Sequence, residues 1–246
     1  NGEIYNYPDL RRDFEKEGSH FRTNCDTEIL LHLYRRDGIQ GFRRLRGMFA
    51  FALWDGTRNE LFLLRDPFGM KPLYFSLIGT KLVFASEMKG ILAHTDVPRA
   101  RDGQAFHDFL NFRFVPGPAT LLESVKSLRP GHLFTWHAGR VEERPFLDLP
   151  RQDSIPDSPE DLDLEIRRRL SLSVSRHLLS DVPLGAYLSG GLDSTAVVAS
   201  MARAEADLFI HTGDTVYADQ PVLAEMRAGD GTTFKNLTTQ AKSKVA

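Results

Sequence analysis

A run of glycines and small polar residues near the end of the chain has the composition of an anion-binding loop. Ser189-Gly190-Gly191-Leu192-Asp193-Ser194-Thr195 follows an apolar stretch that ends at Leu188. Adjacent glycines leave backbone N–H groups open to a ligand, and a helix after them adds the positive end of its dipole. The hydroxyls of Ser189, Ser194 and Thr195 are further donors. These residues predict a phosphate-binding loop.

The spacing of this loop separates it from the Walker type of phosphate site. The pattern G-x-x-x-x-G-K-S/T is not met, and no lysine stands at the matching place. A kinase-like or GTPase-like function is therefore excluded for this motif. A tight turn between a strand and a helix is the structural alternative, because most isolated Gly-Gly pairs make such turns.

The elements around the loop are those of a nucleotide-binding α/β unit. The apolar run 184–188 predicts a buried parallel strand, and 195–204 predicts the helix that follows the loop. Upstream, Ser158 and Pro159 carry the signals of a helix start, and the helix is expected to end near Leu179. A strand is also expected within 205–214, before a Thr-, Lys- and Gly-rich tail.

The first part of the chain has the patterns of an α+β domain. Aromatic and β-branched runs predict strands at 48–54, 60–64, 72–77 and 81–85, which are expected to form one antiparallel meander. A hairpin is expected across 132–146, with its turn at Ala138-Gly139. Start and stop signals predict helices at 6–18, 26–36 and 103–112. A proline-rich stretch predicts a linker at 148–158 between domains 1–147 and 159–246.

Composition and charge exclude several classes of protein for this chain. The 246 residues include 31 basic and 33 acidic side chains, for a net charge of −2. This balance argues against a general binder of nucleic acid or of anionic membranes. No run of about 18 apolar residues is present, and the single cysteine excludes an internal disulfide. We therefore expect a cytoplasmic protein, and a homodimer is left open.

Several motifs together resemble one enzyme family. The N-terminal ones are Asn1-Gly2-Glu3-Ile4-Tyr5-Asn6, Cys25-Asp26-Thr27-Glu28, Leu45-Arg46-Gly47-Met48-Phe49-Ala50-Phe51 and Arg65-Asp66-Pro67-Phe68-Gly69-Met70-Lys71-Pro72-Leu73-Tyr74. They resemble the glutaminase domain of the glutamine-hydrolysing asparagine synthetases. The loop at 189–195 resembles the pyrophosphate loop of the ATP-pyrophosphatase superfamily, which supplies the second domain of that family.

The resemblance implies a fold and a reaction. The fold is an αββα N-terminal-nucleophile glutaminase sandwich, followed by the start of an α/β adenine-nucleotide-hydrolase-like domain. The reaction is the amidation of aspartate to asparagine, with glutamine as ammonia donor and a β-aspartyl-AMP intermediate made from ATP with Mg²⁺. The chain is expected to be a fragment truncated at both ends and inactive alone.

The resemblance also implies roles for individual residues. Asn1 and the N–H of Gly2 match the oxyanion-hole pair, and Glu3 and Asp26 match the carboxylates that hold the α-ammonium of glutamine. A helix-start acid is the structural alternative for Asp26. ATP and pyrophosphate would contact the residues from the end of the strand into the helix, namely Leu188, Ser189, Gly190, Gly191, Leu192, Asp193, Ser194 and Thr195. Of these, Asp193 would lie near Mg²⁺.

The single cysteine is not expected to be the nucleophile. In the family that residue is the first of the mature protein and is activated by its own α-amino group. Cys25 is internal, directly ahead of Asp26, and is expected to be a small packing residue.

Two alternatives to asparagine synthesis stay open at this point. One is a related amidotransferase or a β-lactam-synthetase-like enzyme that acts on another carboxylate. The other is a non-catalytic truncated remnant. The sequence does not decide among them, because the family's acceptor-binding residues are expected downstream of this chain.

Overall fold

A computed structural model describes residues 1–147, 158–179, 184–188, 191–204, 208–212, 225–227 and 233–235. The chain divides into two compact units, Asn1–Arg151 and Gln152–Ala246. Among the described residues, no helix is both long and apolar enough to cross a membrane. Apart from Ser158, the stretch expected to be a linker lies outside the described residues, as do Ser189 and Gly190.

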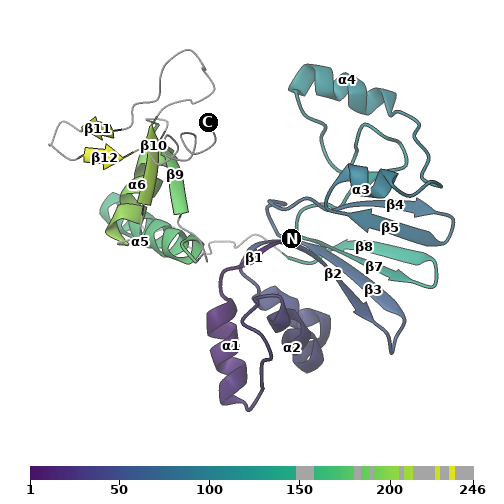
Figure 1. The fold of residues 1–246 in the computed structure, drawn as a ribbon, viewed down its shortest axis with the longest axis horizontal. Coiled ribbons are helices and arrows are strands. Elements are labelled where there is room, and N and C mark those ends of the chain that lie inside the picture. Colours follow the sequence, from purple (N-terminus) through teal and green to yellow (C-terminus); the bar gives the residue numbers. More distant parts are fainter. Residues whose placement is uncertain are drawn as a thin grey trace, which may run out of the picture. The chain divides into compact units, whose positions relative to one another are not determined.

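The first unit contains two antiparallel sheets (Figure 1). The five-stranded sheet has the order β1-β2-β3-β7-β8, with β1 at Gly2–Ile4, β2 at Gly47–Asp55, β3 at Glu60–Arg65, β7 at His132–His137 and β8 at Arg140–Pro145. The three-stranded sheet has the order β5-β4-β6, with β4 at Tyr74–Ile78, β5 at Lys81–Ala85 and β6 at Lys126–Ser127.

The expected meander is wrong, because its four strands belong to two sheets. The β2–β3 and β4–β5 hairpins both form, but β3 pairs with β7 and β4 pairs with β6. The short turns between neighbouring strands predict these hairpins from the sequence. They do not predict the pairing of β3 with β7, because that pairing joins residues about seventy positions apart. The hairpin expected across 132–146 is confirmed as β7–β8.

Helices cover both outer faces of this pair of sheets (Figure 1). On one side lie α1 at Tyr7–Lys16, α2 at Glu28–Asp37 and the 3₁₀ helix η1 at Gly38–Arg44, and on the other lies α3 at Met88–Leu92. The next helix in the chain, α4 at Gly103–Phe112, stands apart from the sheets in Figure 1. One apolar cluster joins α1, α2 and η1 to the five-stranded sheet, a second joins the two sheets, and a third joins α3 to the three-stranded sheet. The expected αββα layering is confirmed.

The alternation of side chains along β2 explains this layering. Phe49, Phe51 and Leu53 pack in the cluster beneath the helices, whereas Ala50 packs in the cluster between the sheets. Successive side chains of a strand point to opposite faces, so Ala52 and Trp54 also face the second sheet. Both are exposed there. The inner face of β2 is therefore covered only near its beginning.

The second unit contains the strand and the helix expected on either side of the predicted loop. Its helices are α5 at Pro159–His177 and α6 at Leu192–Arg203, and its strands are β9 at Leu184–Leu188, β10 at Leu208–Thr212, β11 at Glu225–Arg227 and β12 at Thr233–Lys235. The Ser158 hydroxyl accepts a hydrogen bond from Asp161 N at 3.0 Å, which confirms the predicted cap of α5. β9 and β10 pair in parallel, as an α/β unit requires.

Candidate functional site

Close backbone contact between β1 and β2 fixes the start of the chain. The Asn1 amino group donates to Ala50 O at 3.1 Å, and Ala50 N donates to Asn1 O at 2.9 Å. Gly2 has φ +117, and a Cβ there would lie 1.9 Å from the carbonyl oxygen of Met48. Only glycine fits this position, because the φ disfavours other residues and the space is already filled.

A hydrogen bond brings Asp26 to the same strand. Ile4 N donates to Asp26 Oδ2 at 2.9 Å, across 22 residues of sequence. The other carboxylate oxygen, Oδ1, accepts from Thr27 Oγ1 at 3.2 Å and from Cys25 Sγ at 3.6 Å. Asp26 precedes α2, whose first residue is Glu28. Its carboxylate is thus directed to the edge of β1 and does not cap the helix.

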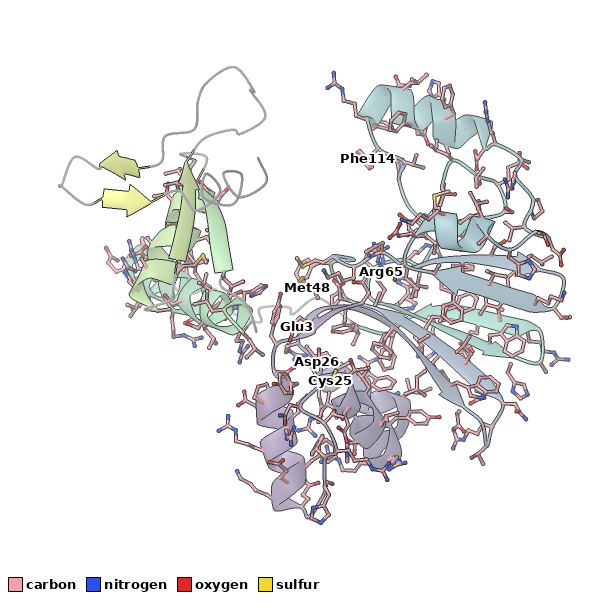
Figure 2. All side chains as sticks on the ribbon, viewed as in Figure 1. Glu3, Cys25, Asp26, Met48, Arg65 and Phe114 are labelled. Atoms are coloured by element: carbon pink, nitrogen blue, oxygen red, sulfur yellow. The ribbon has the colours of Figure 1, made fainter. Side chains whose placement is uncertain are left out.

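Glu3 is the chain neighbour of Ile4, whose N–H contacts this carboxylate, and Figure 2 shows Glu3 and Asp26 close to each other. Glu3 is half-buried and pairs in register with Met48 of β2. Partial burial, and after it the negative charge of Glu3, raise the pKa of Tyr5. The Glu3 carboxylate is therefore close enough to Tyr5 for its charge to affect the ionisation of the phenol. Two neighbouring carboxylates form a site suited to an ammonium group.

Cys25 is exposed, so the expectation of a packing residue is wrong. The local reason is that Thr23 to Thr27 form a polar turn: Cys25 N donates to Thr23 Oγ1 at 3.2 Å, and Ile29 N donates to Asp26 O at 3.2 Å. The thiol meets the carboxylate of Asp26. A carboxylate carries a negative charge, whereas the side chains that activate a nucleophilic thiol are those of Lys, Arg or His.

The sequence motif at 65–74 forms a braced loop beside Asn1. Asp66 is completely buried, and its carboxylate accepts from the N–H groups of Phe68, Met70 and Lys71 at 3.0–3.1 Å. Asp66 N donates to Phe49 O at 2.9 Å, next to the Asn1–Ala50 pair. The loop is therefore attached to β2 where β1 begins.

Arg65 closes the same loop from within. Its guanidinium donates to the carbonyls of Lys71, Gly69 and Leu128 at 2.7 Å each, and to Ser127 Oγ at 3.0 Å. Burial lowers the pKa of this group. Sequence reasoning used Arg65 and Asp66 only as part of a motif. Their role in bracing the loop could not be read from the sequence, since most of their partners are backbone groups.

Within the second unit, the predicted phosphate loop is described only from Gly191 onward. Gly191 caps α6, and its carbonyl oxygen accepts from Thr195 N at 3.1 Å, Thr195 Oγ1 at 2.8 Å and Ser194 Oγ at 3.1 Å. The helix starts three residues earlier than expected and includes Leu192, which is 92% exposed. Asp193 is exposed in the first turn, and Leu188 ends β9.

The side chains described at this loop could bind a metal ion only if phosphate oxygens supplied further ligands. In the described part of the chain, no three His, Cys, Asp or Glu side chains are grouped as metal ligands. Mg²⁺ is commonly held by one or two carboxylates and by the phosphates of its substrate. A single carboxylate, Asp193, is compatible with that arrangement.

Comparison with known proteins agrees with these two units. A family model described as "Glutamine amidotransferase domain" matches residues 1–147, and one described as "Asparagine synthase" matches residues 165–228. Glutamine-hydrolyzing asparagine synthetase 1 of Bacillus subtilis is 40% identical over 200 residues, which are 80% of this chain and 31% of that protein. Synthetase 3 of the same organism is 36% identical, over 81% of this chain and 32% of its own length.

The chain thus spans about a third of the length of the curated relatives it matches. One solved structure, glutamine phosphoribosylpyrophosphate amidotransferase from B. subtilis complexed with ADP and GMP, is 22% identical. The matched region covers 91% of this chain and 48% of the chain in that structure, with a TM-score of 0.43. From the two family matches, the chain belongs to the glutamine amidotransferase domain family and continues into the asparagine synthase domain, as glutamine-hydrolysing asparagine synthetases do.

Proposed function

We propose that this chain is part of an enzyme that converts aspartate to asparagine with glutamine as the nitrogen donor. The first unit would bind glutamine, and the second would bind ATP and activate aspartate as β-aspartyl-AMP. The observation that carries the first half is the hydrogen bond from Ile4 N to Asp26 Oδ2, which brings Asp26 to the strand that carries Glu3. A cytoplasmic location and a homodimer stay predictions.

The glutamine site follows from the positions of four groups. Glu3 and Asp26 would bind the α-ammonium of glutamine, because two carboxylates at one place give a charge-assisted site. The Asn1 side chain and the N–H of Gly2 would donate to the oxyanion that forms when the amide is attacked. Asn1 is exposed and held through its backbone, so its side chain is available for that contact.

The ATP site follows from the start of α6. Backbone N–H groups at Gly190 and Gly191, and the hydroxyls of Ser189, Ser194 and Thr195, would hold phosphate oxygens at the helix N-terminus. Leu188 and Leu192 would border the nucleotide. Mg²⁺ bound to the phosphates would supply the positive charge that stabilises the departing pyrophosphate. Asp193 would hold that ion.

Binding of glutamine to the 246-residue chain tests the proposal. We expect L-glutamine to bind in isothermal titration calorimetry, and N-acetyl-L-glutamine not to bind, since acetylation removes the ammonium charge. Asp26→Asn keeps an oxygen that can accept from Ile4 N but removes the negative charge. It should therefore weaken binding about tenfold or more, which is about 1.4 kcal/mol.

Asp9→Asn is the matched control, because Asp9 is exposed on α1 and its side chain pairs with Arg12. This variant should bind glutamine as the unchanged chain does. Equal binding of glutamine and its acetylated form, or unchanged binding in both Asp26→Asn and Glu3→Gln, would contradict the proposed site.

A further inference from the structure

The turn ahead of α2 links the carboxylate of Glu28 to that of Asp26. Glu28, the first residue of the helix, accepts from Arg22 N and Thr23 N at 2.8 Å each, and from the Thr23 hydroxyl at 2.6 Å. The same hydroxyl accepts from Cys25 N at 3.2 Å. Because Cys25 directly precedes Asp26, the Thr23 hydroxyl connects the start of the helix to the residue that contacts β1.

The direction of both hydrogen bonds at this hydroxyl is fixed by its two partners. The side-chain hydrogen bond from Thr23 is the largest cause, and the backbone one from Arg22 the second, of a pKa of Glu28 that is lowered to about 2. The carboxylate is therefore ionised at neutral pH and can only accept. The backbone N–H of Cys25 can only donate. A single oxygen atom on residue 23 thus serves both partners at once, as donor to one and acceptor from the other.

The contacts continue from Cys25 to β1. The hydrogen bond of Cys25 N holds the chain ahead of Asp26, and the one from Ile29 N to Asp26 O, at 3.2 Å, holds it behind. Between these two points, the half-buried Asp26 carboxylate accepts from Ile4 N at 2.9 Å. The place of this carboxylate beside β1 therefore depends on how the Cys25 peptide is oriented.

We propose that Thr23 positions Asp26 for the α-ammonium of glutamine. This inference rests on the proposed function, in which Asp26 and Glu3 together bind that ammonium. The Thr23 hydroxyl fixes the Cys25 peptide, and through it the direction from which the Asp26 carboxylate reaches β1. A charge-assisted hydrogen bond weakens when its acceptor moves or turns away. Thr23 is thus a positioning residue, which acts on the ligand through Asp26.

A substitution can remove this hydroxyl and leave the rest of the turn attached. Thr23→Val keeps the size and the branching of the side chain. Glu28 still accepts from two backbone N–H groups, and the guanidinium of Arg11 still donates to the carbonyl oxygen of residue 23 at 2.8 Å. Cys25 is exposed, so its N–H can bind water in place of the hydroxyl. We therefore expect the unit to fold, with Asp26 held less firmly.

Glutamine binding to the 246-residue chain, measured by isothermal titration calorimetry, tests the inference. Thr23→Val should weaken binding of L-glutamine about fivefold, whereas Thr23→Ser keeps the hydroxyl and should bind within about twofold of the unchanged chain. In an Asp26→Asn background, Thr23→Val should cause no further loss, because the charge through which Thr23 acts is already absent. A general loosening of the unit would instead weaken binding in both backgrounds.

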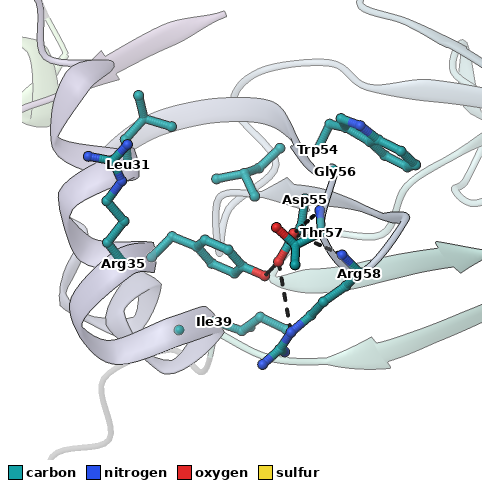
Figure 3. A pocket seen from close by; sticks show the side chains of 11 residues that line it. Leu31, Arg35, Ile39, Trp54, Asp55, Gly56, Thr57 and Arg58 are labelled. Atoms are coloured by element: carbon teal, nitrogen blue, oxygen red, sulfur yellow. Dashed lines mark hydrogen bonds and ion pairs between the residues drawn. The ribbon is translucent and has the colours of Figure 1, made fainter.

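Thr57→Val is the matched control, because it makes the same change in an exposed turn at the other end of β2. Thr57 lines a pocket formed by α2, η1 and the end of β2, where it lies close to Asp55 (Figure 3). Its N–H donates to Asp55 Oδ1 at 2.9 Å, and its hydroxyl makes no hydrogen bond within the described part of the chain. This variant should bind glutamine as the unchanged chain does.

Hydrogen exchange gives a second measurement that needs no ligand. In the free chain, Thr23→Val should speed exchange at the amides of Cys25 and Ile4 about fivefold or more. Thr23→Ser should leave both rates nearly unchanged. Ile4 is the more informative amide, because it belongs to β1 and is connected to the turn through Asp26.

Three results would overturn the proposal. One is glutamine binding that Thr23→Val does not weaken, and another is an equal loss of binding with and without the Asp26 charge. The third is exchange at Ile4 that Thr23→Val leaves unchanged. If L-glutamine does not bind to the unchanged chain, the proposed glutamine site fails instead, and the exchange rate at Ile4 still decides whether Thr23 positions Asp26.

Discussion

Two glycines allow β1 and β2 to approach each other more closely than side chains permit. A Cβ at Gly2 would lie 1.9 Å from Met48 O, and one at Gly47 would lie 2.1 Å from Glu3 O. Both residues have positive φ, at +117 and +153. The backbone N–H of Gly2 belongs to the proposed oxyanion pair, so the contact that places β1 would also place that proposed donor.

Gly2→Ala should therefore destabilise the first unit. The added methyl group meets backbone atoms that cannot rotate away, and the positive φ adds backbone strain, for a loss of about 2 kcal/mol or more in unfolding free energy. Urea denaturation followed by circular dichroism measures this loss. Gly103→Ala is the control, since nothing lies within 4 Å of a Cβ there and φ is not positive. If both variants unfold alike, the contact with Met48 does not constrain β1.

The residues of the candidate glutamine site could be predicted from the sequence only in part. The residue types at positions 1, 2, 3 and 26 were sufficient to predict a glutamine site through resemblance. The hydrogen bond from Ile4 N to Asp26 Oδ2 was not predictable, because it depends on how the segment ahead of α2 returns to β1. For Cys25, the chemical type alone suggested packing, whereas the polar turn around it leaves it exposed.

At the scale of elements, local signals predicted the strands and helices well, but they did not predict which strands share a sheet. Start and stop residues located α4 at 103–112, and the Ser158 cap located the start of α5. Pairing of β3 with β7 depends instead on the apolar faces of strands far apart in the sequence. Hydrophobic alternation specifies the face of a strand, not its neighbour.

The start of α2 provides a prediction about pH. The Glu28 carboxylate accepts from Arg22 N, Thr23 N and Thr23 Oγ1 at 2.6–2.8 Å. The Thr23 side-chain hydrogen bond is the largest cause, followed by that from the Arg22 backbone, and together they lower the pKa of Glu28 from 4.5 to about 2. A lowered pKa means that the ionised form stabilises the fold above pH 4.5 and that this stabilisation is lost as the pH falls toward 2.

Glu28→Gln should consequently lower the urea midpoint at neutral pH, and its difference from the unchanged chain should shrink between pH 4.5 and about 2. Denaturation curves at half-unit pH intervals measure this difference. Glu123→Gln is the control, because Glu123 is exposed and no side-chain hydrogen bond to it occurs among the described residues. A difference that does not depend on pH would show that the charge of Glu28 is not what stabilises the turn.

At the scale of the whole molecule, the proposed chemistry is divided between two units. Residues 1–147 match the glutamine amidotransferase domain, and 165–228 match asparagine synthase. Each unit has its own helices and strands, and the proposed glutamine and phosphate sites have no residue in common. A substitution at the start of α6 should therefore affect ATP chemistry without removing the groups that hold glutamine.

Gly191→Val tests this division in an enzyme that carries both units in full. Gly191 has φ −74 and ψ 162, an extended conformation that valine also adopts, and its carbonyl oxygen can still accept from Thr195 N. The added side chain would instead meet the phosphate oxygens that the backbone N–H groups approach. Asp193→Asn differs in that it removes only a negative charge near Mg²⁺. Both substitutions should reduce pyrophosphate release severely, while ammonia release from glutamine largely persists.

Ammonia and pyrophosphate are measured side by side for each variant. Ala202→Val serves as the control, since it introduces the same valine side chain at an exposed position near the other end of α6. This control should release both products at the unchanged rate. Pyrophosphate release that persists in Gly191→Val would mean that residues 189–195 form only a turn between β9 and α6. Loss of ammonia release along with pyrophosphate release would mean instead that glutamine hydrolysis depends on the state of the second unit, so that the two sites are coupled although they share no residue.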